Sequence, residues 1–165
     1  MRRCTTPPCR ALRCTWPRSE TLTCNGRARG LLLGIDMVKD SATLEAAYDD
    51  ALGVTAAFNK NLLLNVNAQL GADFDVRQWR HVALFNAGQS RIEMHLEASC
   101  DLTVRWPGHE RRFAAGERIH TENSYKWTID GFSQLLVDAG FAQPVAWTDA
   151  ATPEHGRFAV LWASA

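Results

Sequence analysis

The sequence carries no net charge, because its 18 lysine and arginine residues balance 18 aspartate and glutamate residues. A protein that binds nucleic acid through the phosphates needs a strongly basic surface, so we expect no nucleic-acid partner. Long apolar runs are missing too. Residues 31–38 are far shorter than the roughly 20 residues that span a membrane, and Asp36 interrupts them. We therefore expect no membrane partner, and a length of 165 residues suits one soluble domain or slightly more.

Recognisable metal-binding patterns are also absent from the sequence. The five histidines form neither an HxH nor an HExxH motif, and the early cysteines do not repeat a CxxC unit. We therefore expect no metal site. A secretory signal would place an apolar stretch after the basic start, and residues 4–18 are not apolar. A cytoplasmic protein with reduced thiols is the simpler expectation.

Residues 1–29 differ from the rest of the chain. They contain seven arginines, four cysteines and three prolines, with almost no aliphatic side chains. Such a segment cannot bury enough apolar area to offset the entropy lost on ordering. The sharp change near Gly30 favours a mis-translated or wrongly started N-terminus, and a genuine disordered arm is the alternative.

An orderly pattern begins at residue 31. Residues 31–38 form a short apolar run, which predicts a strand buried on both faces of a parallel sheet. Asp40 or Ser41 can cap a following helix, and a second helix is predicted between Gly53 and Gly71. We expect the second helix to bury a stripe of apolar residues mostly four apart: Val54, Phe58, Leu62, Val66 and Leu70, with Leu63 beside them.

The next region changes to a period of two. Apolar Ile92, Met94 and Leu96 alternate with polar residues, and residues 102–106 do the same. This alternation predicts antiparallel strands with one buried face, and residues 107–108 predict a turn. Residues 121–127 either continue this sheet or leave it.

The last region predicts a helix and two strands. Thr128 can cap a helix that ends at Gly140, and residues 145–148 and 158–162 follow as strands. The whole order is strand, helices, antiparallel insert, helix, strand, strand, which indicates an α/β protein with an inserted lobe.

Several separated motifs resemble one enzyme family. They are residues 31–40 (LLLGIDMVKD), 47–50 (AYDD), 53–59 (GVTAAFN), 91–94 (RIEM) and 120–127 (HTENSYKW). Together they resemble the histidine-specific, S-adenosylmethionine-dependent N-α-methyltransferases of ergothioneine biosynthesis, in particular their C-terminal part. The resemblance covers nearly everything after residue 30.

The resemblance implies a fold and a cofactor. The fold would be the back half of a Rossmann-like class I methyltransferase sheet (residues 30–39 and 126–165), with an inserted α+β substrate-binding lobe (residues 40–125). The cofactor would be S-adenosylmethionine. However, the glycine-rich loop that binds it in the family has no counterpart here, because Gly26, Gly30 and Gly34 do not form a strand–GxGxG–helix unit. We therefore expect a partial chain that is inactive alone and a monomer when complete, and we leave its cofactor-binding residues unassigned.

Glu122 and Ser124 are the first substrate-binding candidates. Residues two apart in an extended segment project to the same face. An imidazole offers one N–H donor and one acceptor nitrogen, which a carboxylate and a hydroxyl can satisfy. The resemblance implies that this pair holds the imidazole of the substrate, L-histidine.

Tyr48 and Met94 complete the predicted site. The resemblance places the tyrosine near the substrate amine, where its phenol would orient the lone pair, and this makes Tyr48 the candidate catalytic residue. An unperturbed phenol has a pKa near 10, so Tyr48 is not expected to act as a general base. The resemblance also places Met94 beside the substrate ring, where a thioether packs favourably.

Two hypotheses follow for function. The first is an S-adenosylmethionine-dependent enzyme that methylates the α-amine of L-histidine and is present as a part. The second is a non-catalytic module that retains only an amino-acid pocket. Histidine binding without cofactor binding would favour the second hypothesis.

Overall fold

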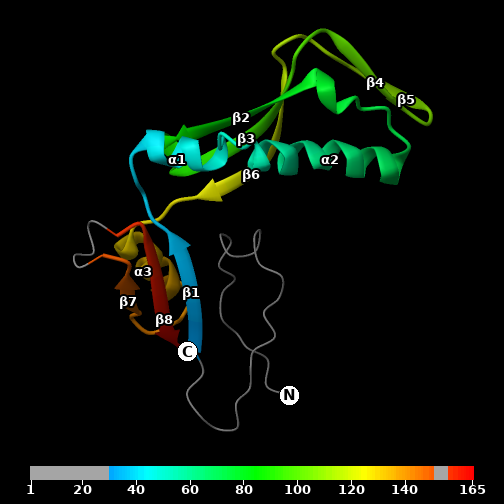
Figure 1. Ribbon diagram of the computed structural model, residues 1–165. Helices are drawn as coiled ribbons and strands as arrows, with labels where there is room; N and C mark the ends of the chain where they lie inside the picture. The colour runs from blue at the N-terminus through cyan, green and yellow to red at the C-terminus, as the bar shows by residue number, and fades with distance from the viewer. Residues whose placement is uncertain (1–29, 151–155) are drawn as a thin grey trace, which may run out of the picture. The chain divides into compact units, whose positions relative to one another are not determined.

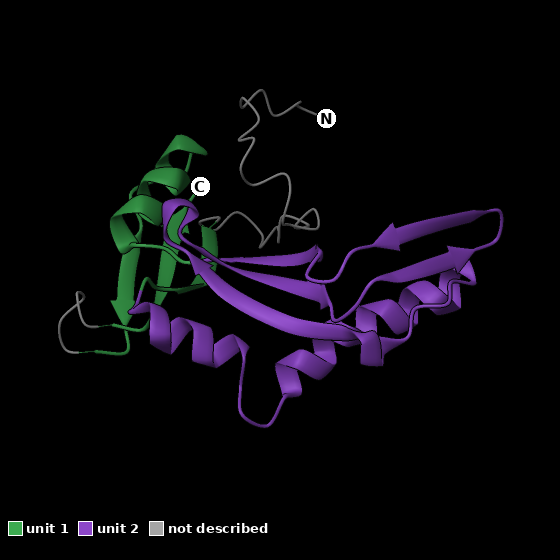
Figure 2. Ribbon diagram, turned by 90° about the horizontal axis from the view of Figure 1, so that it is seen from above, with its two compact units in different colours: residues 1–38, 126–165 green, residues 39–125 purple. Residues whose placement is uncertain are grey.

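The computed structural model describes residues 30–150 and 156–165, which form two compact units (Figure 2). Unit 1 takes in the described residues of 1–38 and 126–165, and unit 2 is residues 39–125. The predictions for residues 1–29, with the four early cysteines, lie outside the described residues. No helix of the described part is long and apolar enough to cross a membrane.

Unit 1 is a three-stranded antiparallel sheet with a helix on one face (Figure 1). Its strand order is β1-β8-β7. Helix α3 begins after Thr128, whose hydroxyl accepts a hydrogen bond from the Gly131 amide at 3.1 Å, so the predicted cap is confirmed. The predicted helix and the two final strands are present. The elements are β1 (Gly30–Asp36), α3 (Ile129–Asp138), β7 (Val145–Thr148) and β8 (Phe158–Ser164).

The core of unit 1 lies between α3 and one face of this sheet. Leu33 and Ile35 of β1 and Leu161 of β8 pack in one buried cluster with Phe132 and Leu136 of α3. Leu161 and Leu136 are completely buried. The alternate residues of each strand point to the opposite face, which α3 does not cover.

The environment predicted for residues 31–38 is wrong. β1 pairs antiparallel with β8, which is its only partner among the described strands. Leu32 is 62% exposed, whereas Leu33 and Ile35 are buried, so β1 is buried on one face. An apolar run resembles a doubly buried strand whenever both faces are apolar, and sequence alone cannot tell whether both are covered.

An ion pair between Lys126 and Asp36 connects residue 126, where the chain re-enters unit 1, to the end of β1. The Lys126 side chain is fully buried, and its Nζ lies 2.7 Å from Oδ2 of Asp36. Backbone hydrogen bonds reinforce the junction, from the Trp127 amide to the Asp36 carbonyl (3.0 Å) and from the Val38 amide to the Trp127 carbonyl (3.1 Å). The chain segments on either side of unit 2 are therefore fastened together within unit 1.

Unit 2 contains an antiparallel sheet in the order β2-β3-β6, a separate hairpin of β4 and β5, and two helices along one face of the sheet (Figure 1). The predicted strands and turn are present, but residues 92–96 of β3 are all buried, so this strand does not have the single buried face that was predicted. The segment from residue 121 stays in the sheet up to Tyr125. The elements are α1 (Ser41–Tyr48), α2 (Val54–Leu70), η1 (Val76–Gln78), β2 (Trp79–Asn86), η2 (Ala87–Gln89), β3 (Arg91–Ala98), β4 (Leu102–Trp106), β5 (His109–Phe113) and β6 (Arg118–Tyr125).

The start of α1 and both ends of α2 fall at the predicted residues. Oδ1 of Asp40 accepts a hydrogen bond from the Thr43 amide at 2.8 Å and so caps α1. Helix α2 ends before Gly71, which has a φ of 66° that glycine adopts without strain. These signals are local in the sequence, so they could be predicted without tertiary information.

The predicted buried face of α2 is wrong. Val54, Phe58 and Leu70 are 64%, 62% and 58% exposed, whereas Asn59 and Leu63 are buried. Asn59 can be buried because its Nδ2 donates to Nδ1 of His81 (3.0 Å) and to the His95 carbonyl (3.1 Å). Specific hydrogen bonds to the sheet thus decide which side of α2 is turned inward.

Candidate functional site

The sheet register places Glu122 and Ser124 beside the apolar side chains of β3. Met94 lies opposite Glu122, and Ile92 lies opposite Ser124. Side chains of directly opposed residues in an antiparallel pair project to the same face. Ile92 and Met94 pack with Leu44 of α1, so this is the face that the helices cover.

Tyr48 reaches the same place from the end of α1. Its hydroxyl lies 2.7 Å from Oγ of Ser124, although the two residues are 76 positions apart in the chain. The Tyr48 ring packs against the cluster of Leu44, Ile92 and Met94. The structure therefore brings three of the four predicted site residues into direct proximity: Tyr48, Met94 and Ser124.

Glu122 borders this cluster and is exposed. In the described part of the chain its carboxylate makes no hydrogen bond, although its backbone carbonyl accepts one from Nε2 of His120 at 3.1 Å. A carboxylate of this kind can accept hydrogen bonds from a ligand without first giving up a partner in the protein. Register and exposure thus make Glu122 the charged acceptor next to a phenol, a hydroxyl and a thioether.

Two residues that the sequence did not single out for a role hold Tyr48 in position. Nε2 of His81, on β2, donates to the Tyr48 carbonyl at 2.8 Å, which leaves Nδ1 to accept from Nδ2 of Asn59 at 3.0 Å. His81 is 6% exposed and Asn59 is completely buried. No signal in the sequence pointed to this role, because α2 contains four asparagines and only the fold shows that Asn59 is the completely buried one.

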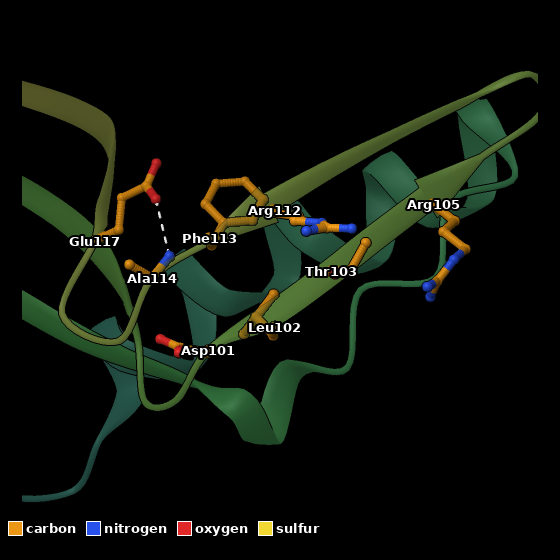
Figure 3. Close-up of a pocket in the computed structure, with 8 residues that line it drawn as sticks. All are labelled: Asp101, Leu102, Thr103, Arg105, Arg112, Phe113, Ala114 and Glu117. Atoms are coloured by element: carbon orange, nitrogen blue, oxygen red, sulfur yellow. Dashed lines mark hydrogen bonds between the residues drawn. The ribbon is translucent and has the colours of Figure 1, made fainter.

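A pocket elsewhere in unit 2 does not coincide with these residues. It lies along the β4–β5 hairpin and the turn that follows, and Figure 3 shows Arg105 and Arg112 at its lining. Oε2 of Glu117 accepts the Ala114 amide at 3.1 Å across that turn. None of the four predicted site residues lines this pocket, so concavity and the predicted chemistry point to different places. The pocket lining contains no residue of the family-like motifs, so the candidate site is the cluster around Tyr48 and Ser124.

The described residues do not fit a S-adenosylmethionine site of the glycine-loop type. Such a site needs a strand, a glycine-rich turn and a helix whose N-terminus faces the ligand. Residues 37–40 connect β1 to α1 and residues 126–128 connect β6 to α3, and neither connection contains a glycine. The described part of the chain therefore offers no such loop.

Fold and site together define an α/β chain in which a small sheet-and-helix unit is interrupted in sequence by a lobe with a polar cluster. The chain belongs to the SAM-dependent, histidine-specific methyltransferase family, whose family model matches residues 17–165. The match begins before Gly30 and so includes part of the segment that the sequence pattern set apart.

Individual relatives agree with this family. The chain is 48% identical over 123 residues to a histidine N-alpha-methyltransferase of Mycolicibacterium smegmatis, covering 73% of this chain and 38% of that protein. It is 43% identical over 148 residues to one of Mycobacterium tuberculosis, covering 82% of this chain and 44% of that protein. It is 29% identical over 112 residues to ergothioneine biosynthesis protein 1 of Schizosaccharomyces pombe, covering 67% of this chain and 14% of that protein. The chain thus spans about two fifths of the length of the bacterial relatives.

Proposed function

We propose that unit 2 is the substrate-binding lobe of a histidine N-α-methyltransferase and that it binds the imidazole ring of L-histidine. Two bacterial relatives named for this activity, at 48% and 43% identity, support the proposal. The observation that carries it is the cluster of Tyr48, Ser124 and Met94, with Glu122 at its border.

The chemistry of the cluster suits an imidazole. The Glu122 carboxylate accepts the ring N–H, and the Ser124 hydroxyl serves the second ring nitrogen. The Tyr48 hydroxyl lies 2.7 Å from Oγ of Ser124, so the two hydroxyls contact the ring as a hydrogen-bonded pair. Met94, which is 3% exposed, supplies a thioether surface for the ring.

In this proposal Tyr48 is the residue nearest the reacting amine. Its hydroxyl orients the amine lone pair by a hydrogen bond, which is a positioning contribution to transfer of a methyl group. Its backbone is held by His81 and Asn59, so its hydroxyl starts from a fixed place. S-adenosylmethionine would supply the methyl group, and its binding residues stay unassigned.

Two measurements on the purified chain test the proposal. Isothermal titration calorimetry with L-histidine tests the lobe, and we expect saturable binding that the Glu122→Gln variant weakens. Glu110→Gln, on the exposed β5 strand, is the matched control and should bind as the parent does. No binding by a chain shown to be folded would contradict the proposal.

Mass spectrometry after incubation with S-adenosylmethionine and L-histidine tests the reaction itself. Methylated histidine would identify the chain as a working enzyme. Histidine binding without methylated product would favour the second function, a non-catalytic amino-acid-binding module. The observation that favours this second function is the lack of a glycine-rich loop at both strand-to-helix connections described above.

A further inference from the structure

The face of the unit 2 sheet opposite the helices gathers two histidines and a glutamate. Glu93 and His95 are two apart on β3, so both project to this face, and His120 lies opposite His95 on β6. One ligand atom from each of the three lies within 4.8 Å of the others. The His95 and His120 rings are stacked, with centroids 4.6 Å apart and an interplanar angle of 28°.

A β-bulge creates this arrangement. The register passes from Met94 opposite Glu122 to His95 opposite His120, which leaves Thr121 as an extra residue on β6. In an unbroken register His120 would share the helix-covered face with Glu122, because the two are an even number of residues apart. Bulges commonly redirect a side chain in this way, and this one turns His120 toward His95.

Glu93 is held with one oxygen free. Three donors converge on its Oε1: Arg91 Nη2 at 2.7 Å, Arg91 Nε at 2.9 Å and Asn86 Nδ2 at 3.0 Å. Its Oε2 lies 3.7 Å from Nε2 of His95, too far for a hydrogen bond. The Arg91 guanidinium also holds the pKa of the Glu93 carboxyl below its ordinary value, so Glu93 is a fixed carboxylate.

His95 has an unsatisfied nitrogen in a buried place. The residue is 9% exposed, and its Nδ1 is buried with no hydrogen-bond partner among the described residues. Burial lowers the pKa of His95, and the nearby His120 lowers it further, which favours the neutral imidazole that metals bind. A buried polar atom without a partner costs free energy, so the protein alone does not satisfy the His95 ring.

His120 is oriented as metal-bound histidines are. Its Nε2 donates to the Glu122 carbonyl at 3.1 Å, which fixes the tautomer and leaves the Nδ1 lone pair available. Ligating histidines usually donate their other ring N–H to a carbonyl or a carboxylate in the same manner.

A simple ion pair between Glu93 and a protonated His95 explains less of this geometry. The two groups lie 3.7 Å apart, which is within ion-pair range, but such a pair gives no role to His120, whose ring stacks on His95. Burial also lowers the pKa of His95, which opposes its protonation.

We propose that Glu93, His95 and His120 form a binding site for a divalent transition-metal ion, with zinc as its occupant and one position open to water. Two imidazoles and one carboxylate are an established three-ligand set for zinc. This site lies on the other face of the sheet from Tyr48 and Ser124 and does not depend on histidine binding. The expectation of no metal site rested on single-segment motifs, whereas these ligands come from two strands joined by a bulge.

Zinc titration of the full chain, with chelator removed and thiols alkylated, tests the proposal. Alkylation excludes the five cysteines as ligands. We expect one equivalent of zinc to bind, measured by calorimetry, and to shift the ring ¹⁵N resonances of His95 and His120. His120→Ala removes an exposed ligand and should weaken zinc binding by more than the roughly 10–100-fold that loss of a ligand's supporting partner costs.

His109→Ala is the matched control, because His109 is an exposed histidine on β5. It should bind zinc as the parent does, and circular dichroism should show both variants folded. Glu93→Gln provides a second variant with the same shape and no charge, and it should also lose affinity. Zinc binding that neither His120→Ala nor Glu93→Gln weakens, or no binding by the folded parent, would overturn the proposal.

Discussion

The sheets of the two units differ in how polar their two faces are. The unit 2 sheet is apolar toward its helices and polar on the other side, where Arg80 and Arg118 pair with Glu97. The unit 1 sheet is apolar on both sides, and α3 covers one of them. The other side carries six large side chains that are 38–62% exposed: Leu32, Val145, Trp147, Phe158, Val160 and Trp162.

This difference indicates which sheet face needs cover. The polar outer face of the unit 2 sheet can remain in water. A contiguous apolar face such as that of the unit 1 sheet marks a surface that another polypeptide usually covers. Unit 2 also exposes the large apolar side chains of Val54, Phe58 and Leu70, but these lie on α2 and not on its sheet.

The largest expected effect is a difference in unfolding free energy between substitutions on the two faces of the unit 1 sheet. Leu161→Ala empties a fully buried position and should lower the free energy of unfolding by about 2–5 kcal/mol. Val160→Ala changes the adjacent residue, which is 43% exposed on the other face, and should cost less than about 1 kcal/mol. Urea denaturation of both variants measures the contrast. Equal losses would mean that the outer face is buried in solution, and the comparison between the units would fail.

The next effect concerns the buried charge of unit 1. Lys126→Ala removes the ammonium at 2.7 Å from Asp36, whose side chain is 26% exposed, and should destabilise the protein by about 1–3 kcal/mol. Adding Asp36→Asn should restore part of the loss, because the negative charge is then removed. Thermal unfolding of the single and double variants measures this, and a double variant no more stable than Lys126→Ala would contradict the explanation.

The third effect belongs to the proposed site in unit 2. Glu122→Ala should weaken L-histidine binding by about 1–3 kcal/mol, because one charge-assisted hydrogen bond is lost. The side chain is exposed, so the free energy of unfolding should hardly change. Calorimetry and denaturation separate these two results. Unchanged affinity would remove Glu122 from the site, and a large loss of stability would make its role structural.

The smallest effect is a pH dependence at the start of α2. Hydrogen bonds from the Thr55 and Val54 amides lower the pKa of Asp50 from 3.8 to about 2. The folded state therefore keeps this carboxylate ionised at a lower pH than the unfolded chain does. The contribution of ionised Asp50 to the free energy of unfolding is complete above pH 3.8 and disappears as the pH falls through about 2.

Asp50→Asn should therefore make the free energy of unfolding less dependent on pH in this acidic range. Asp49→Asn is the matched control and should retain the dependence of the parent. Denaturant unfolding at a series of acidic pH values measures the slopes, and parallel curves for the parent and Asp50→Asn would rule out this cap as the source.

The sequence predicted the features that depend on neighbouring residues. The caps at Asp40 and Thr128, the stop at Gly71 and the alternation in β3 are all local signals, and the structure contains them. No strand was predicted for Trp79–Asn86, which forms β2. Residues 82–85 of this strand are continuously apolar, so no alternation is visible there.

Features that depend on distant partners could not be predicted in the same way. The inward face of α2 follows from the hydrogen bonds of Asn59, and the exposed side of β1 follows from its pairing with β8. In the site, family motifs suggested Tyr48 and Ser124, but their hydroxyl contact required the folded register. The substrate roles of these residues stay predictions.

The bulge at Thr121 reverses the alternation of side chains along β6. Glu122 and Ser124, after the bulge, face the helices, whereas His120, before it, faces the other side of the sheet. Deleting Thr121 would give β6 one regular alternation along its whole length, without replacing any of these three side chains. The two proposed sites could then no longer coexist in their present places. This strand is therefore more vulnerable to a change in length than to a change in composition, and variation in length here would separate relatives that keep both sites from those that keep one.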